Sequence, residues 1–323
     1  MSPVACHLTL VHMGELKLLR AFRKGAPKHP WLRVGPGSDC AVLEWKPGRD
    51  LVYKIDQVVE GTHFVLSGRE AATPREIGWK AMAKACSDIA AAGAWPVAAT
   101  VAVNLRKGTP ERVAMELYRG ITACCRKYRF ALAGGDFATS PQGMSVVVSL
   151  VGECPKGKAW TRSGAKPGDY LFVTGPLGGS RAKKHLTFQP RLEAAREIRK
   201  RLGNGVHACI DITDGLSRDL HHLCAESRVG AVLFETLLPY SAAARRIARS
   251  GRSALDQALS DGEDFELLLA VAPSALAALR KRERLRLPIH VIGRVSRAGR
   301  GVIIQRASGG YQRLADIGYE HRT

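Results

Sequence analysis

Segments with the periodicity of strands and of helices alternate along this chain in two successive halves, and this order restricts its fold more than any other feature. In the first half, apolar or alternating runs predict the strands at 40–44, 51–59, 97–104, 130–133 and 144–152. Two helices are expected, at 74–92 and 109–128, each with a proline near its start. A short amphipathic helix is expected ahead of them, at 15–23. This mixed order predicts a domain of the α/β class, of the α+β type.

The second half follows a turn at 166–169 and has the same mixed character. Its predicted strands are 170–174, 208–213, 231–235, 266–271, 289–295 and 301–305. Its predicted helices are 191–201, 215–228, 241–249 and 273–280. A boundary expected near 153–160 gives an N-terminal domain over 13–153 and a C-terminal domain over 154–323. Residues 1–12 are interpreted as a disordered extension.

The net charge of +20 and the resulting high isoelectric point raise the question of nucleic-acid binding. The basic residues are spread over many predicted helices, without an RNA-binding strand motif, a zinc knuckle or a basic tail, and aromatic residues make up only 6%. We therefore interpret them as solvated helix faces. A basic nucleic-acid-binding or non-catalytic protein is kept as an alternative from a different class.

Three further features of the sequence concern the cellular compartment of the protein. No apolar run approaches the length of a membrane span, and the first residues lack the pattern of a secretion signal. The eight cysteines show no metal-binding spacing, which is typical of reduced, mostly buried thiols. Together these features predict a cytoplasmic protein with no membrane partner.

Six aspartates are expected in short loops, each beside a glycine, a small residue or another polar residue: Asp39, Asp56, Asp88, Asp136, Asp211 and Asp214. Any one of them alone could be a turn residue or a helix cap. Their recurrence in both halves instead favours an enzyme that binds Mg²⁺ and a nucleotide, because Mg²⁺ is held by carboxylate oxygens beside substrate phosphates. In DITDGLSRDL, two carboxylates and the Thr213 hydroxyl can face one polyphosphate–metal site at the start of a helix.

The motifs that contain these residues resemble those of a known family. In chain order they are GELKLLR, VGPGSDCAVL, DQVVEGTHF, REIGWKAMAKACSDIAAAGAWP, AGGDFATS, TRSGAKPGDYLFVTGPLG, DITDGLSRDL and SDGEDFELLL. Over residues 13–295 the chain is similar to thiamine-monophosphate kinases, of the aminoimidazole-ribonucleotide-synthetase-like superfamily. It lacks a cysteine after Cys224, unlike hydrogenase-maturation relatives, and the reactive N-terminal cysteine or selenocysteine of selenophosphate synthetases.

The resemblance implies a two-domain fold like that of aminoimidazole ribonucleotide synthetase. The N-terminal α/β domain would dimerise through its strands, giving a homodimer, and ATP would lie in the cleft between it and the C-terminal α/β domain. The implied reaction passes the γ-phosphoryl group of ATP to the phosphate of thiamine monophosphate, giving thiamine diphosphate and ADP. No general base is needed, because the attacking group is already a phosphate oxygen.

The resemblance also implies roles for individual residues. All six aspartates match Mg²⁺ ligands. Gly135, Asp136, Arg162 and Thr213 match nucleotide contacts, and His63 and Glu263 match contacts to the thiamine phosphate. Asp56, Asp136 and Arg162 are the residues expected to act in catalysis, Arg162 as a bidentate clamp on phosphate.

Some residues depart from the family pattern. Ser38 stands where a second aspartate is usual, and Lys54-Ile55 stands where two hydroxyl residues are usual. Near the C-terminus, Asp316 aligns with an aromatic residue, and Tyr319 follows three positions later. One interpretation is a working kinase in which the Lys54 ammonium replaces one of several Mg²⁺ ions. Another is a divergent paralogue that binds Mg-ATP but uses another acceptor. A third is that Lys54 points to solvent, since Lys54 and Ile55 face opposite sides of a strand.

Overall fold

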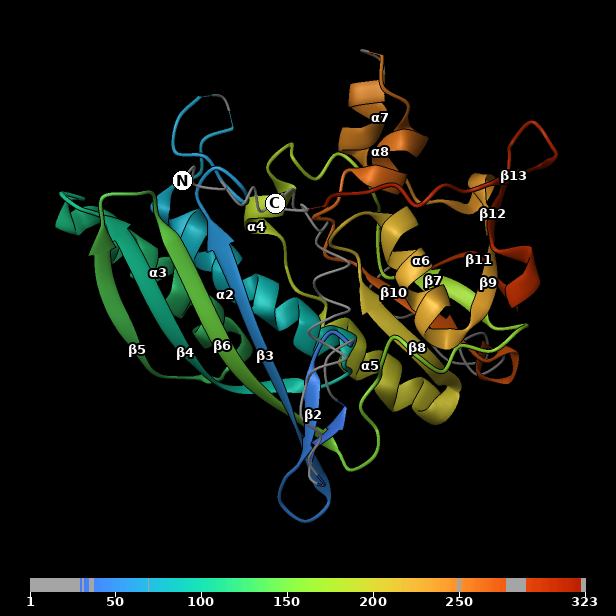
Figure 1. Ribbon diagram of the computed structural model, residues 1–323, viewed down its shortest axis with the longest axis horizontal. Helices are drawn as coiled ribbons and strands as arrows, with labels where there is room; N and C mark the ends of the chain where they lie inside the picture. The colour runs from blue at the N-terminus through green and yellow to red at the C-terminus, as the bar shows by residue number, and fades with distance from the viewer. Residues whose placement is uncertain are drawn as a thin grey trace, which may run out of the picture.

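The computed structural model describes residues 30, 32–34, 38–68, 70–248, 251–276 and 289–320. The extension expected at 1–12, the helix expected at 15–23 and the end of the helix expected at 273–280 lie outside the described residues. Two β-sheets with their helices lie next to each other in the molecule (Figure 1). Among the described residues, no helix combines the length and hydropathy that a membrane crossing requires.

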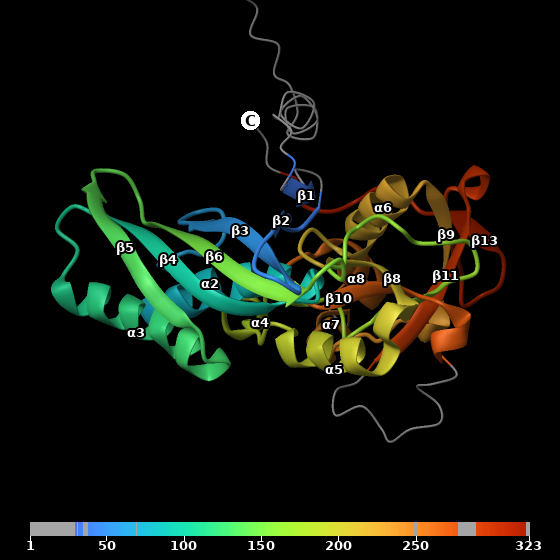
Figure 2. The same ribbon diagram turned by 90° about the horizontal axis from the view of Figure 1, so that it is seen from below.

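The N-terminal sheet has six strands, with helices on one face. Its strands are β1 (Leu32–Val34), β2 (Ala41–Glu44), β3 (Arg49–Val59), β4 (Trp95–Arg106), β5 (Ala131–Ser140) and β6 (Ser145–Pro155). They are ordered β1-β2-β3-β6-β4-β5, and only β4 and β5 run parallel. Helices α2 (Pro74–Ala91) and α3 (Glu111–Tyr128) lie on the same side of this sheet (Figure 2).

The C-terminal sheet has seven strands, with helices on both faces. Its strands are β7 (Tyr170–Val173), β8 (Val206–Asp211), β9 (Val229–Phe234), β10 (Leu267–Val271), β11 (His290–Arg297), β12 (Val302–Gln305) and β13 (Tyr311–Arg313). They are ordered β13-β12-β9-β11-β7-β10-β8, and only β9 and β12 run parallel. The helices are α4 (Lys184–Thr187), α5 (Leu192–Leu202), α6 (Leu216–Ser227), α7 (Ala242–Ile247) and α8 (Ala254–Ser260). Helix α5 packs on one face of the sheet, and α6 and α8 pack on the other.

Helix α2 lies between the two sheets and is buried almost all round. Its first turn is held by a capping box between Thr73 and Glu76. Its alanine-rich sequence lets neighbouring elements approach closely, and glycines do the same where α2 meets α3. A Cβ on Gly78 would lie 2.1 Å from the carbonyl oxygen of Leu117. One apolar core therefore runs from the N-terminal sheet through α2 to α5 and one face of the C-terminal sheet.

The two-domain α/β architecture expected from the sequence is confirmed, and the predicted strands and helices are present within the described residues. The short elements β1, α4, α8 and β13 were not predicted. The division at 153–160 stays a prediction, because the apolar core is continuous across it.

The expectation that all six aspartates lie in loops is wrong for four of them. Asp56 lies in β3, Asp88 in α2 and Asp136 in β5, and Asp211 is the last residue of β8. Strand β5 continues through the glycine-rich segment GGDFATS because that segment pairs in register with β4 as far as Ser140.

Candidate functional site

A cavity of about 270 Å³ lies where the two halves of the molecule meet. Its walls come from β3 and α2 of the first half and from the loops that follow β8 and precede β10 in the second. The lining residues are Lys54, Asp56, Thr62, His63, Lys84, Asp88, Arg162, Arg181, Asp211, Thr213, Asp214, Asp261, Glu263, Phe265 and Tyr319. The lining is therefore rich in charges of both signs, as expected for a site that binds a polyanion together with cations.

Two crossed ion pairs join β3 to α2 at the cavity wall. Lys54 Nζ lies 2.9 Å from Asp88 Oδ1, and Lys84 Nζ lies 2.8 Å from Asp56 Oδ1. Residues two apart on a strand and four apart on a helix each share a face, so both pairs point the same way. Ile55 faces the other side of the sheet and is 63% exposed. The interpretation of Lys54 as a solvent-facing strand residue is thus wrong.

The titration of these groups follows from their surroundings. Burial works to lower the pKa of Lys54, but the carboxylates of Asp88 and Asp56 outweigh it and hold that pKa above its usual range. Burial works to raise the pKa of Asp56, but Lys54 and Lys84 outweigh it and lower that pKa. The Lys54 side chain is therefore a permanent positive charge in the cavity wall.

Three buried carboxylates from both halves converge beside these pairs. Oxygens of Asp39, Asp88 and Asp211 all lie within 4.8 Å of one another. Arg162 donates to Asp39 Oδ1 from Nη2 at 2.8 Å, and Ser87 donates to Asp211 Oδ2 at 2.6 Å. Burial, and then the charge of Asp39, raise the pKa of Asp211 to about 7. Three buried carboxylates with oxygens this close together form an oxygen cluster that fits Mg²⁺.

The loop between β8 and α6 carries Thr213 and Asp214 into the cavity. Asp219, buried in the first turn of α6, accepts hydrogen bonds from the backbone N–H groups of both residues, at 2.9 and 3.1 Å. Asp214, Asp219 and His222 form a second group of possible cation ligands. Asp219 was not predicted as a site residue. The signal was its position in DITDGLSRDL soon after a turn, where the carboxylate of an acidic residue commonly accepts hydrogen bonds from backbone N–H groups of the loop.

The segment before β10 brings Glu263 to the cavity in a constrained conformation. Glu263 and Phe265 have φ of 53° and 51°, in the left-handed region that non-glycine residues rarely adopt. The Glu263 N–H donates to the Thr213 carbonyl at 2.7 Å, which ties this segment to the loop after β8. Left-handed non-glycine residues are commonly found at functional sites.

Lys80 of α2 holds the two residues expected to contact the thiamine phosphate. Its Nζ donates to the His63 carbonyl at 2.6 Å and pairs with Glu263 Oε1 at 2.5 Å. The Lys80 side chain is wholly buried. Sequence reasoning missed this residue, because Glu76 and Lys84 lie four residues before and after it, and such a charged stripe is typical of a solvated helix face.

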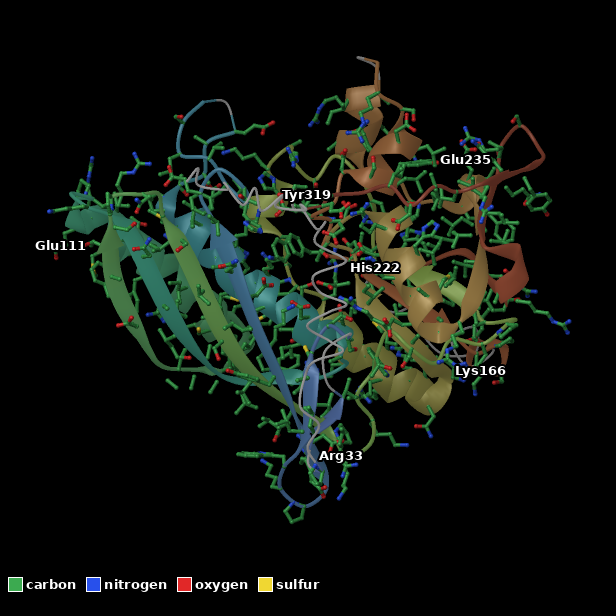
Figure 3. All side chains as sticks on the ribbon, viewed as in Figure 1. Arg33, Glu111, Lys166, His222, Glu235 and Tyr319 are labelled. Atoms are coloured by element: carbon green, nitrogen blue, oxygen red, sulfur yellow. The ribbon has the colours of Figure 1, made fainter. Side chains whose placement is uncertain are left out.

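The C-terminal segment brings an aromatic ring to the cavity. Tyr319 lines it, and its backbone N–H donates to the Asp214 carbonyl at 3.0 Å. Asp316, at the aligned position, instead pairs with Arg218 at 3.3 Å. Figure 3 shows Tyr319 where the two halves meet and His222 on the C-terminal half.

Asp136 and Gly135 are not brought to this cavity. They lie on β5, at the opposite edge of the sheet from β1 and separated from β3 by β6 and β4. Asp136 is exposed, and its register partner is Ala102. The other five aspartates, with Arg162, Thr213, His63 and Glu263, lie in or next to the cavity.

Comparison with known proteins agrees with this architecture. Residues 37–154 match the family described as AIR synthase related protein, N-terminal domain, and residues 166–306 match AIR synthase related protein, C-terminal domain. The fold and the site between the halves thus define an AIR-synthase-related protein of two domains.

Similarity to individual proteins identifies the family within this class. The chain is 38% identical over 316 residues to the thiamine-monophosphate kinase of Rhodopirellula baltica, covering 95% of this chain and 97% of that protein. It is 30% identical to the Bacillus subtilis enzyme of the same name, covering 96% and 99%. The solved structure of AaThiL complexed with AMPPCP and TMP matches with a TM-score of 0.81 and 26% identity, over 95% of this chain and 97% of that one. The chain belongs to the thiamine-monophosphate kinase family, which confirms the predicted resemblance.

Proposed function

We propose that this chain transfers the γ-phosphoryl group of ATP to the phosphate of thiamine monophosphate, forming thiamine diphosphate and ADP. The observation that carries the proposal is the convergence of Asp39, Asp88 and Asp211 from both halves on one cavity that also contains Arg162. Transfer between two phosphate groups depends mostly on positioning and on neutralising negative charge. This lining offers groups for both tasks.

Each part of the cavity would hold a different part of the reactants. Asp56, Asp88, Asp39, Asp211 and Asp214 would hold Mg²⁺, which when bound neutralises the charge of the two polyphosphates. Arg162 would turn its guanidinium from Asp39 toward the nucleotide phosphates. Thr213 would donate its hydroxyl beside it, from the loop that leads from β8 into α6.

The acceptor would lie against the opposite wall. His63 and Glu263, joined through Lys80, would contact thiamine monophosphate. Tyr319 supplies an aromatic ring on the same cavity, so that its ring rather than the Asp316 carboxylate would pack on the thiamine rings.

We also propose a homodimer formed through the N-terminal sheet. On the face away from α2, the side chains of Tyr53 and Ile55 are 41% and 63% exposed, and their positions two residues apart on β3 form a continuous apolar surface that a second chain could cover. Asp136 shares this face through its register with Ala102, Val147 and Gln57. Nucleotide and metal contacts of Gly135 and Asp136 would therefore require a second chain.

The activity is tested with purified protein, Mg-ATP and thiamine monophosphate, by separating thiamine phosphates chromatographically. We expect thiamine diphosphate from the wild type, none from Asp211→Asn, and wild-type rates from Glu116→Gln, a control on the exposed surface of α3. Binding of ATP without any thiamine diphosphate would contradict the proposal and favour a paralogue with another acceptor. Salt-sensitive binding of RNA or DNA without Mg-ATP would instead indicate the nucleic-acid alternative.

The dimer is tested by sedimentation velocity. Ile55→Glu should shift the protein to monomers, because it places a charge in the proposed interface. Leu237→Glu, at a residue 46% exposed on the C-terminal half, should leave the dimer intact. A wild-type monomer at micromolar concentration would contradict the proposed dimer.

A further inference from the structure

The Lys54 ammonium lies beside the carboxylate cluster of the proposed site. It contacts Asp88 at 2.9 Å, and Asp88 belongs to the three-carboxylate cluster with Asp39 and Asp211. The Lys54 side chain is 22% exposed and lines the cavity, so its charge can face a bound polyphosphate. Its position combines contact with the carboxylate cluster and access to the ligand.

The chemistry of lysine limits what it can do at this point. An ammonium group has three donors and no acceptor, so it cannot ligate a metal ion. It can act as a compact positive charge on phosphate oxygens. With Lys54 on Asp88 Oδ1 and Lys84 on Asp56 Oδ1, two of the carboxylates expected to hold Mg²⁺ already have a lysine partner.

We propose that Lys54 is a resident cation of the site, which takes the place of one divalent ion between Asp88 and the bound polyphosphate. The inference rests on the proposed function and deepens it. This chain would then bind its nucleotide with one divalent ion fewer than a chain with a hydroxyl residue at position 54. Its affinity for nucleotide would also depend less steeply on Mg²⁺ concentration.

The competing explanation is that the Lys54–Asp88 ion pair only stabilises the packing of β3 against α2. An ion pair with this structural role would affect stability without changing how many metal ions bind. The Lys84–Asp56 pair joins the same two elements, so the fold has a second connection if Lys54 is changed. The number of bound metal ions therefore separates the two explanations.

The experiment counts Mn²⁺ ions bound per chain in the presence of the nucleotide analogue AMPPCP, from the electron paramagnetic resonance signal of free Mn²⁺. We expect Lys54→Ser to bind one more Mn²⁺ than the wild type, since serine restores an oxygen ligand and removes the charge. Lys54→Arg should keep the wild-type count. Lys107→Ser, in the exposed turn after β4, is the matched control and should also keep it.

A second variant keeps the proposal testable if Lys54→Ser does not fold. Lys54→Met keeps most of the side-chain volume but supplies neither charge nor ligand. We expect its Kd for AMPPCP to rise roughly tenfold, as for the loss of one charge-assisted hydrogen bond. Raising the Mg²⁺ concentration should not restore the nucleotide affinity of Lys54→Met. In Lys54→Ser, by contrast, any loss of nucleotide affinity should be restored by a higher Mg²⁺ concentration.

An equal Mn²⁺ count in the wild type and Lys54→Ser, or unchanged nucleotide affinity in Lys54→Met, would overturn the inference. Neither measurement uses thiamine monophosphate. A failure to phosphorylate that acceptor would therefore leave the inference standing, whereas a wild type that binds neither Mn²⁺ nor AMPPCP would remove both.

Discussion

The pairing of Lys80 with Glu263 gives a sharp prediction about how the two halves of the site are held together. Lys80 Nζ is wholly buried and contacts the His63 carbonyl at 2.6 Å and Glu263 Oε1 at 2.5 Å. Lys80→Met keeps the volume of the side chain and removes both contacts. We expect this variant to lose stability and affinity for thiamine monophosphate together, because it releases both His63 and Glu263.

The expected loss of stability in Lys80→Met follows from the surroundings of the Lys80–Glu263 ion pair. Loss of one partner of a buried ion pair costs about 3–5 kcal/mol, mostly because the other charge remains without compensation. The Glu263 side chain is 23% exposed and can regain water, which reduces this cost. Burial lowers the pKa of Lys80, against the effect of Glu263, so removal of the ammonium also recovers part of a desolvation penalty. We therefore expect the free energy of unfolding to fall by about 2 kcal/mol.

The assay is urea unfolding of the wild type, Lys80→Met, Glu263→Gln and the double variant, with Lys200→Met on α5 as a surface control. The double variant should be more stable than the sum of the two single effects predicts, by at least about 1 kcal/mol. Additive effects within about 0.3 kcal/mol would refute the coupling on which this reasoning depends. The affinity for thiamine monophosphate should fall in both single variants and stay unchanged in the control.

Two further predictions concern the segment before β10. Gly262 has φ of 71°, and a Cβ on it would lie 2.6 Å from the Thr213 carbonyl oxygen, whereas Gly157, with φ of 68°, has nothing within 4 Å of its Cβ position. Urea unfolding should therefore show that Gly262→Ala destabilises the protein by about 1–3 kcal/mol more than Gly157→Ala does. Calorimetry should show weaker AMPPCP binding by Gly262→Ala. Equal effects of the two substitutions on stability would show that only the backbone conformation matters, and not the contact with Thr213. Burial raises the pKa of Asp264 to about 7 from its usual 3.8. Between those values the unfolded chain has released a proton that the folded chain keeps, so folding stability falls as pH rises toward 7. Relative to Asp264→Asn, the wild type should lose up to about 3 kcal/mol between pH 5 and pH 8, and parallel stability curves of the two proteins would contradict this.

Strand β3 shows what could be predicted from the sequence and where prediction ended. Its alternation places Lys54 and Ile55 on opposite faces. Which face meets the cavity depends on α2, which packs against the face that carries Lys54 and Asp56. The solvent-facing interpretation of Lys54 could be excluded only once that helix was placed.

Asp136 shows the same limit in another way. Its motif matches a nucleotide and metal contact by resemblance, and a loop was expected there. The parallel pairing of β5 with β4 instead makes it part of an edge strand, away from the cavity of its own chain. Lys80 could not have been assigned a role either, because its two partners come from a loop after β3 and from the segment before β10.

The sequence by itself determined the class of fold, the family and most of the acidic residues of the site. These depend on periodicity and on short motifs, which are properties of neighbours along the chain. Only the tertiary structure decided which charges pair: Lys54 with Asp88, Lys84 with Asp56, and Lys80 with Glu263. The physical reason is that electrostatic interaction and burial depend on distances in space, and these distances are set by the packing of α2 between the two sheets.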